Sequence, residues 1–239
     1  MAKKPTKADA TKSLLSAIET RKLAAAKDAL EAGADPNALD DRTPVLWIAL
    51  YAGRYDIAKV LVDHGAKVDW ADDHGTLLAG LVDNDGEKIP KPDAAAALWL
   101  IEHGANCTRA SRPSGRTPLM DAVRSGHHEL IDALFANGAT VGPDKPTGNT
   151  PLHWAVASRA DQWVWDRLLA AGNKLEAKNR AGETPLSLAQ AEGNHAAVAF
   201  LLAKSAKRDV KVAGKTPLDR AVATKQAKII KLLRDVPPE

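Results

Sequence analysis

The tripeptide Thr150-Pro151-Leu152 decides the fold, because it returns along the chain at nearly constant intervals. The same three residues occur at 117–119, 184–186 and 216–218, and weaker copies read Thr43-Pro44-Val45 and Thr76-Leu77-Leu78. Successive threonines are 33, 41, 33, 34 and 32 residues apart. A period of this length predicts an array of stacked structural repeats.

A second marker runs in phase with the first: Gly-Ala pairs end leucine-rich segments at 33–34, 65–66, 104–105 and 138–139. Thr-Pro can start a helix, since threonine caps free backbone N–H groups and proline loses no intrahelical bond in the first turn. Gly126 then allows a left-handed exit from that helix. The following helix carries an apolar stripe (Leu130, Ile131, Leu134 and Phe135), which predicts a face buried against a neighbouring repeat.

Together the two markers resemble the ankyrin repeat over about residues 13–234. The resemblance implies an all-α solenoid of about seven helix-pair units joined by β-turn fingers. We expect a single domain over residues 13–239, with caps near 13–40 and 214–235, after a flexible basic tail at 1–12. In this family the fingers and first helices line the concave face, which implies binding to another protein.

The composition, 45% hydrophobic and 26% charged, is that of a soluble globular protein. No run of 18 uncharged apolar residues is present to span a membrane, and no apolar segment follows the polar start as a secretory signal would require. Cys107 is the only cysteine, which excludes an intrachain disulfide and a multi-cysteine zinc site. These features predict a cytoplasmic protein.

The net charge of +3 is too small to imply nucleic-acid binding by itself. It is unevenly spread, because residues 1–12 carry +3 and residues 203–239 carry +6, which leaves −6 for the middle. We interpret the basic ends as the solvated ends of the solenoid. A basic binding patch is the alternative.

One interval is longer than the others, and it indicates an insertion of about seven residues near 84–92, between the two helices of its repeat. Pro90 and Pro92 favour an extended loop there. Insertions in repeat proteins often map to the binding face, although a tolerant loop can also drift neutrally.

Charged side chains form two candidate groups. The basic group consists of Arg109, Arg112, Arg116, Arg124 and Arg159. These arginines make either one stripe for a carboxylate or phosphate partner, or locally paired surface charges. The acidic group lies upstream and consists of Asp69, Asp72, Asp73, Asp83 and Asp85. The two groups together would orient a dipolar protein partner, whereas ordinary turn polarity explains the aspartates equally well.

Aromatic residues divide into packing positions and candidate contacts. Trp47, Trp99, Trp154 and Trp165 fall at positions that predict core or half-buried packing. The candidate contacts are Tyr51 near the end of a first helix, Trp70 in a finger and Trp163 at a position that is charged in the neighbouring repeat. The repeat register near 43–53 leaves open whether Leu50 or Tyr51 faces out.

Histidines are mostly assigned to structure. His153 matches the family's histidine that hydrogen-bonds finger backbone, and His127 matches the start of a second helix. His64 and His103 can bond the last carbonyls of their helices. His74, at a finger tip, is the one histidine kept as a candidate contact.

Catalytic motifs are absent from the sequence: no G-x-S-x-G, P-loop, G-x-G-x-x-G or H-E-x-x-H occurs. Cys107 precedes three arginines that could lower its pKa, but we expect it in a surface turn without an identifiable base. No histidine pair has zinc-ligand spacing. We therefore expect no catalytic residue, no cofactor and no metal.

These observations predict a non-catalytic, monomeric protein that binds another protein through its concave face, fingers and insertion loop. The alternative is an inhibitor or immunity protein that blocks an enzyme or toxin. Nucleic-acid binding through the basic ends is less favoured, and no membrane contact is expected.

Overall fold

The computed structural model describes residues 6–72, 75–82, 91–111 and 114–235 of the chain. These residues form two compact units, the first reaching as far as Asn106 and the second starting at Cys107. That the whole of 13–239 is a single domain stays a prediction. None of the described helices is long and apolar enough to cross a membrane.

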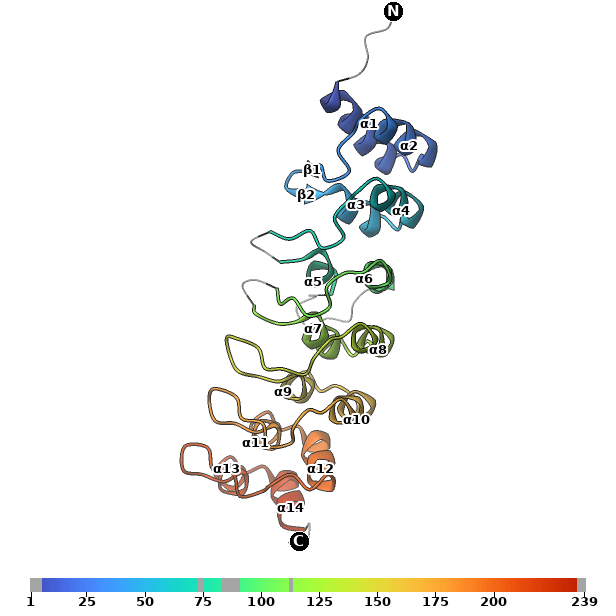
Figure 1. Cartoon of the computed structure of the whole chain (residues 1–239). Coiled ribbons are helices and arrows are strands. Elements are labelled where there is room, and N and C mark those ends of the chain that lie inside the picture. The colour runs from blue at the N-terminus through green and yellow to red at the C-terminus, as the bar shows by residue number, and fades with distance from the viewer. Residues whose placement is uncertain (1–5, 73–74, 83–90, 112–113, 236–239) are drawn as a thin grey trace, which may run out of the picture. The chain divides into compact units, whose positions relative to one another are not determined.

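The first unit contains three helix pairs and one β-hairpin (Figure 1). Its elements are α1 (Lys7–Glu19), α2 (Leu23–Glu31), β1 (Leu39–Asp40), β2 (Thr43–Pro44), α3 (Val45–Tyr51), α4 (Tyr55–Asp63), α5 (Leu77–Val82) and α6 (Lys91–Glu102). The two short strands pair antiparallel, with Leu39 opposite Pro44 and Asp40 opposite Thr43.

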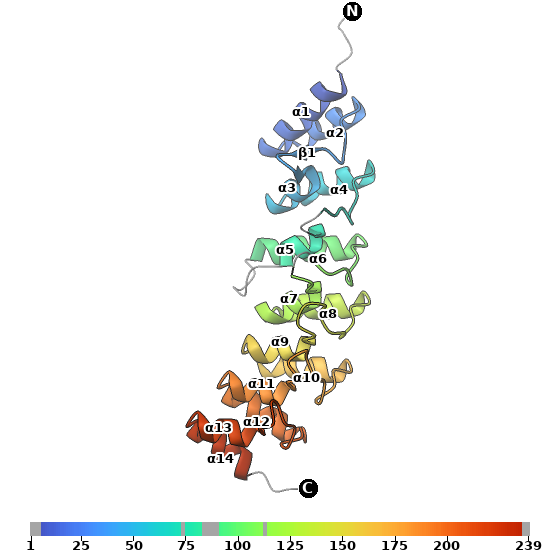
Figure 2. The same cartoon turned by 90° about the vertical axis from the view of Figure 1, so that its left-hand side faces the viewer.

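The second unit contains four helix pairs in regular succession (Figure 2). They are α7 (Pro118–Ser125) with α8 (His128–Ala136), α9 (Pro151–Ala157) with α10 (Gln162–Ala170), α11 (Pro185–Ala191) with α12 (His195–Ala203), and α13 (Pro217–Ala223) with α14 (Ala227–Asp235). The first helices of successive pairs contact one another, and a finger precedes each of them. The described residues of the chain thus form seven helix pairs, which confirms the predicted all-α repeat architecture.

Threonine side chains cap the first helices at the predicted Thr-Pro positions. The hydroxyl of Thr216 accepts a hydrogen bond from the backbone N–H of Asp219 at 3.2 Å, and Thr184 does the same for Ser187 at 3.3 Å. A proline follows each threonine and takes the first helical position, where its missing N–H costs no bond. The predicted helix starts are therefore confirmed.

The predicted apolar stripe of the second helix in the α7–α8 pair supplies core. Leu130, Ile131 and Leu134 are fully buried. Phe135 is only half-buried, and the guanidinium of Arg167 lies over its ring at 4.5 Å from the ring centre. The edge of the stripe is therefore covered by a neighbouring repeat's arginine and not by apolar packing.

Polar side chains also join neighbouring repeats through the turns that follow the second helices. The amide of Asn37 donates to the carbonyl of Gly65 at 3.0 Å, and its oxygen accepts from the N–H of Lys67 at 2.8 Å. Asp69 repeats the device one period later by accepting from the N–H of Asn106 at 2.6 Å. Asp69, which the sequence analysis assigned to the acidic group, thus has a structural role in joining two repeats.

His153 is fully buried and connects two fingers, as predicted. Its Nδ1 accepts from the backbone N–H of Thr150 at 3.2 Å, so its Nε2 carries the proton and donates to the carbonyl of Glu183 at 3.0 Å. Burial lowers the pKa of His153 below its usual 6.5, although the bond to the Glu183 carbonyl acts in the opposite direction. The neutral ring is therefore the form that the fold selects.

The remaining structural histidines also behave as predicted. His64 and His103 contact the carbonyls of Val60 and Trp99 through Nδ1, each at 2.8 Å. His127 is the N-cap of α8, and its Nδ1 accepts from the third N–H of that helix.

Described helices overlap two segments that were predicted as a tail and a loop. Helix α1 begins at Lys7 inside the expected flexible tail 1–12, because Thr6 and Asp9 form a reciprocal capping box. Of the predicted insertion loop near 84–92, residues 84–90 lie outside the described part of the chain. Lys91 and Pro92 form the first turn of α6, where proline is tolerated.

The buried neutral His153 predicts a pH-dependent stability. Because its pKa is lower in the folded than in the unfolded protein, the unfolded state binds the proton more readily. Stability should be greatest above the ordinary histidine pKa and should fall as the pH drops from about 7.5 to about 5.5. Urea unfolding at these two pH values, followed by tryptophan fluorescence, measures the change.

The matched variant is His153→Gln, which can still accept and donate but does not titrate. We expect it to be less stable at neutral pH by about 1–3 kcal/mol and to show a shallower pH dependence. An unchanged pH slope in this variant would show that another group is responsible.

Candidate protein-binding surface

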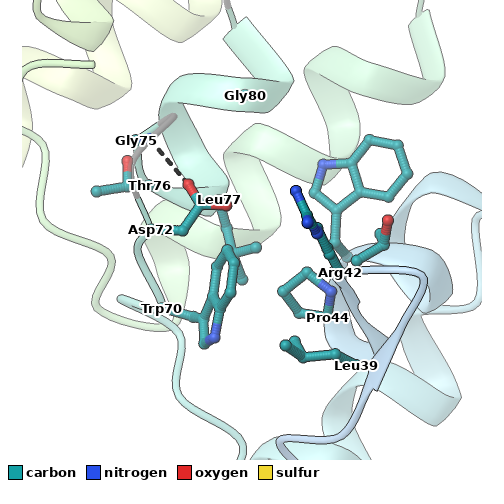
Figure 3. A pocket seen from close by; sticks show the side chains of 11 residues that line it. Leu39, Arg42, Pro44, Trp70, Asp72, Gly75, Thr76, Leu77 and Gly80 are labelled. Carbon is teal, nitrogen blue, oxygen red and sulfur yellow. Dashed lines mark hydrogen bonds between the residues drawn. The ribbon is translucent and has the colours of Figure 1, made fainter. Parts of the chain in front are cut away.

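An open groove of about 680 Å³ lies in the first unit, between the β1–β2 hairpin with α3 and the next finger with α5 (Figure 3). This volume is within the range of ordinary ligand pockets. Its lining residues are Leu39, Arg42, Thr43, Pro44, Trp47, Trp70, Asp72, Gly75, Thr76, Leu77 and Gly80. The groove thus opens among the fingers and first helices, the side that the family resemblance assigns to partners.

Three aromatic side chains lie in or beside this groove and are called here the aromatic strip: Tyr51, Trp47 and Trp70. Tyr51 is 59% exposed and stacks on Trp47, with ring centres 4.8 Å apart and planes 8° from parallel. Trp47 and Trp70 are half-buried and line the groove. The structure therefore places the two predicted contacts at one groove, together with a tryptophan that the sequence assigned to packing alone.

The register of α3 explains why Tyr51 faces out. Pro44 is the N-cap of this helix, so the helix starts at Val45, one residue later relative to its threonine than in the α7 repeat. Leu50 is then fully buried and Tyr51 is exposed. The question that the sequence left open is thereby resolved in favour of Tyr51.

Gly80 keeps the groove open beside Trp47. A Cβ atom added at Gly80 would lie 3.9 Å from the indole Nε1 of Trp47, which is ordinary contact, and the backbone there is helical. A glycine in a helix interior costs stability relative to alanine. This glycine was the sequence signal that could have indicated the role of Trp47.

Arg42 was not identified as a candidate from the sequence, although its backbone conformation is unusual. It has a left-handed conformation (φ 67°) in the tight turn between β1 and β2, two residues before the N-cap of α3. Fingers of the second unit place a glycine two residues before the N-cap: Gly115, Gly148, Gly182 and Gly214. The missing glycine at the hairpin tip was the signal that could have singled out Arg42.

Asp72 lines the groove and also orders its own finger, since its carboxylate accepts from the N–H of Gly75 at 3.1 Å. The other acidic and histidine candidates, Asp73, Asp83 and His74, lie outside the described residues. That the acidic and basic groups together orient a dipolar partner therefore stays a prediction.

Two of the five predicted arginines, Arg116 and Arg124, converge on the buried carboxylate of Asp121 in the second unit. The Nε of Arg116 lies 2.5 Å from Asp121 Oδ1, and Nη1 of Arg124 lies 3.4 Å from the same atom. Both guanidinium groups are 5.7 Å from the ring centre of Trp154. These arginines neutralise an internal charge, which favours the local-pairing interpretation of the basic group.

The structure describes two of the other three basic candidates. Arg159 takes a left-handed conformation (φ 56°) just after α9, and its guanidinium donates to the carbonyl of Glu192 at 3.0 Å. Arg109 is exposed, whereas Arg112 lies outside the described residues. That these arginines contact a partner stays a prediction.

Trp163 is 37% exposed and lies on the second helix α10. It stacks on His128, with ring centres 4.0 Å apart, and His128 Nε2 is 2.8 Å from the carboxylate of Asp161. This contact joins two second helices and is not part of a finger.

Cys107 lies in a turn as expected, but it is buried and not at the surface, with 2% of the residue exposed. A buried thiol is poorly accessible to reactants, so Cys107 is assigned no site chemistry. Across the described ranges, no group of three or more His, Cys, Asp or Glu side chains could hold a metal ion.

Family comparisons agree with this geometry. The family described as "Ankyrin repeats (3 copies)" matches residues 90–179 and 162–237, and "Ankyrin repeat" matches residues 40–73. The chain belongs to the ankyrin-repeat family. Ankyrin repeats are generally non-catalytic protein–protein interaction modules.

Individual ankyrin proteins resemble this chain over part of their length. Human "Palmitoyltransferase ZDHHC13" is 30% identical over 168 residues, which is 70% of this chain and 26% of that protein. Human "SH3 and multiple ankyrin repeat domains protein 2" is 30% identical over 137 residues, covering 57% of this chain and 7% of that protein. Because the matches span about a quarter or less of these relatives, the transferase activity in the first name does not carry over.

Solved ankyrin domains share the fold along nearly the whole chain. The human ASB11 ankyrin repeat domain has a TM-score of 0.70 and 26% identity, covering 95% of this chain and 99% of that one. The ankyrin repeat domain of Bcl-3 has a TM-score of 0.75 at 21% identity, covering 92% and 97%. The comparisons give no support to the predicted inhibitor or immunity role.

The left-handed Arg42 predicts a stabilising substitution. Arg42→Gly should raise the free energy of unfolding by about 1 kcal/mol, because only glycine adopts this conformation without strain. Urea denaturation measures the gain. Arg180→Gly is the control, since this exposed finger arginine lacks a positive φ; a gain of equal size there would remove the strain argument.

The Asp121 cluster predicts that one arginine substitution harms folding. Arg116→Glu should destabilise the protein by about 3 kcal/mol, because it places a second negative charge against a buried carboxylate. Arg159→Glu, which breaks one exposed hydrogen bond, should cost about 1 kcal/mol or less. Equal unfolding midpoints for the two variants would contradict the internal role of Arg116.

Proposed function

We propose that this ankyrin-repeat chain is a non-catalytic module that binds a protein partner on the side formed by its fingers and first helices, the concave face of the family. The observation that carries the proposal is the aromatic strip of Tyr51, Trp47 and Trp70 beside an open groove. Tyrosine and tryptophan supply large contact areas at low entropic cost, and they dominate binding energies at protein interfaces.

The support for a protein partner is physical. Tyr51 is the most exposed of the large apolar side chains in the described part of the chain, and its ring stacks flat against Trp47. A preformed surface loses little conformational entropy on binding, so more of the contact energy appears as affinity. An exposed aromatic side chain adjoining an apolar groove is typical of an interaction site.

The insertion between α5 and α6, the acidic candidates Asp72, Asp73 and Asp83, and His74 are proposed as further contacts, since they belong to the same repeat as Trp70 or adjoin it in sequence. The basic cluster at Asp121 is not included, because its arginines are engaged internally. We further propose a monomer in a reducing compartment, since Cys107 is the only cysteine and is buried.

Site-directed photocrosslinking tests the proposal on the full chain. A photoreactive phenylalanine analogue replaces Tyr51 in one variant and Trp163 in the control, and each is irradiated in lysate of the source cells. We expect a discrete protein adduct from position 51 only, and its loss by more than tenfold when Trp70→Ala is added, because Trp70 forms part of the same surface.

Three results would overturn this assignment. They are an adduct with nucleic acid, equal labelling from positions 51 and 163, and labelling that Trp70→Ala leaves unchanged. Unfolding midpoints of all variants are measured alongside, so that a loss of labelling is compared among folded proteins.

A further inference from the structure

The groove in the first unit offers hydrogen-bond donors that have no acceptors. Neither the guanidinium of Arg42 nor the indole N–H of Trp47 or Trp70 makes a hydrogen bond or ion pair with any residue of the chain as described. Tryptophan N–H groups usually find a partner when they are buried, and both of these indoles are half-buried. These donors are therefore available to an acceptor that enters the groove.

The carboxylates nearby do not satisfy these donors. Asp72 is the acidic residue that lines the groove, and its oxygen accepts from the N–H of Gly75 within its own finger. Asp40 and Asp41 are exposed on the hairpin and do not line the groove. Asp69 accepts from the backbone of Asn106. Arg42 is thus the positively charged residue that lines the groove, and its guanidinium is not engaged by these carboxylates.

The rest of the lining is apolar. Leu39 is 49% exposed at the rim, whereas Pro44 and Leu77 are buried beneath it. Trp70 lies across from Arg42 and Pro44, with the groove between them (Figure 3). A bulky apolar side chain would therefore find contacts on several sides within reach of the arginine.

We propose that this groove binds an extended segment of the partner protein that places a carboxylate side chain on Arg42 and an adjacent bulky apolar side chain against Trp47 and Trp70. The inference rests on the proposed function and specifies the chemistry of the partner. The planar guanidinium suits a carboxylate, with which it forms paired charge-assisted hydrogen bonds. The left-handed backbone holds Arg42 at this place in spite of the strain, where other fingers use glycine.

Peptide libraries test the charge preference directly. Three libraries of short acetylated peptides differ in one central pair, fixed as Leu-Glu, Leu-Gln or Leu-Lys, with randomised neighbours. Each is passed over the immobilised full chain, and recovered peptides are quantified by mass spectrometry. We expect the Leu-Glu library to be enriched about tenfold over the Leu-Gln library and more strongly over the Leu-Lys library.

Charge exchange at Arg42 provides the decisive variant. Arg42→Glu keeps a non-glycine residue in the strained turn, so the backbone strain is the same in the variant and in the natural sequence. The peptide preference should then reverse toward Leu-Lys. Arg21→Glu is the matched control, because Arg21 is exposed, belongs to the same unit and is also left-handed (φ 59°) but does not line the groove. We expect this control to keep the Leu-Glu preference.

Filling the groove gives a second, independent variant. Gly80→Leu places a side chain over Trp47 in a helical position that accepts a Cβ, so the protein should fold and yet lose peptide binding by more than tenfold. Gly80→Ala should fold equally well and retain most of the binding, because its methyl group reaches only ordinary contact distance.

Three outcomes would overturn the inference: equal recovery of Leu-Glu and Leu-Gln peptides, preference of the natural sequence for Leu-Lys, or no peptide recovered at all. If the crosslinking at position 51 still depends on Trp70, the chain remains a protein-binding module whose partner has a different chemistry. If both experiments fail, the proposed function fails with the inference.

Discussion

A single helix pair of this chain has no interior of its own, and the rest of the structure depends on that constraint. Leu130, Ile131 and Leu134 can be buried only because other helix pairs cover them. Stacking therefore supplies the hydrophobic driving force that a globular domain obtains from one central core. The ends of stacked pairs still expose backbone groups, and these are satisfied by side chains such as Asn37, which bonds both a carbonyl and an N–H of the next turn.

Because the stacked helices supply the core, the fingers are available for recognition. Each finger needs little more than one polar side chain to fix its turn: Asp144 accepts from the N–H groups of Thr147 and Gly148, and Asn179 accepts from those of Ala181 and Glu183. Other finger positions can therefore vary from repeat to repeat. The hairpin tip with Arg42 and the finger with Trp70 show that the residues at finger positions can differ strongly between repeats of the same fold.

The sequence was sufficient for the fold because the decisive signals are local. Thr-Pro starts a helix through bonds to the next few residues, and His153 was recognisable because its partners lie in the same motif and in the next finger. The candidate surface was only partly predictable. Tyr51 and Trp70 were identified as unusual residues at exposed positions, whereas their place beside one groove with Trp47 depends on the stacking of repeats and on the register of α3. Single-residue patterns do not contain such contacts.

The arginines also show that a sequence pattern does not reveal contacts between side chains. Arg116 and Arg124 looked like an accessible stripe because their spacing in sequence says nothing about Asp121, whose burial follows from the packing of α7. Arg42 drew no attention because its significance lies in a dihedral angle that other fingers reserve for glycine. Both cases required the position of the backbone before the side chain could be interpreted.

The bonds between neighbouring repeats also bear on how the chain acquires its structure during synthesis. Side-chain hydrogen bonds between repeats join residues separated by intervals such as 28, 30 and 38 positions, about one period of the array. Contacts this close in sequence have a small loop-closure cost and are associated with rapid folding. A nascent chain can therefore begin to fold once two repeats have left the ribosome, and each later repeat finds its template already in place.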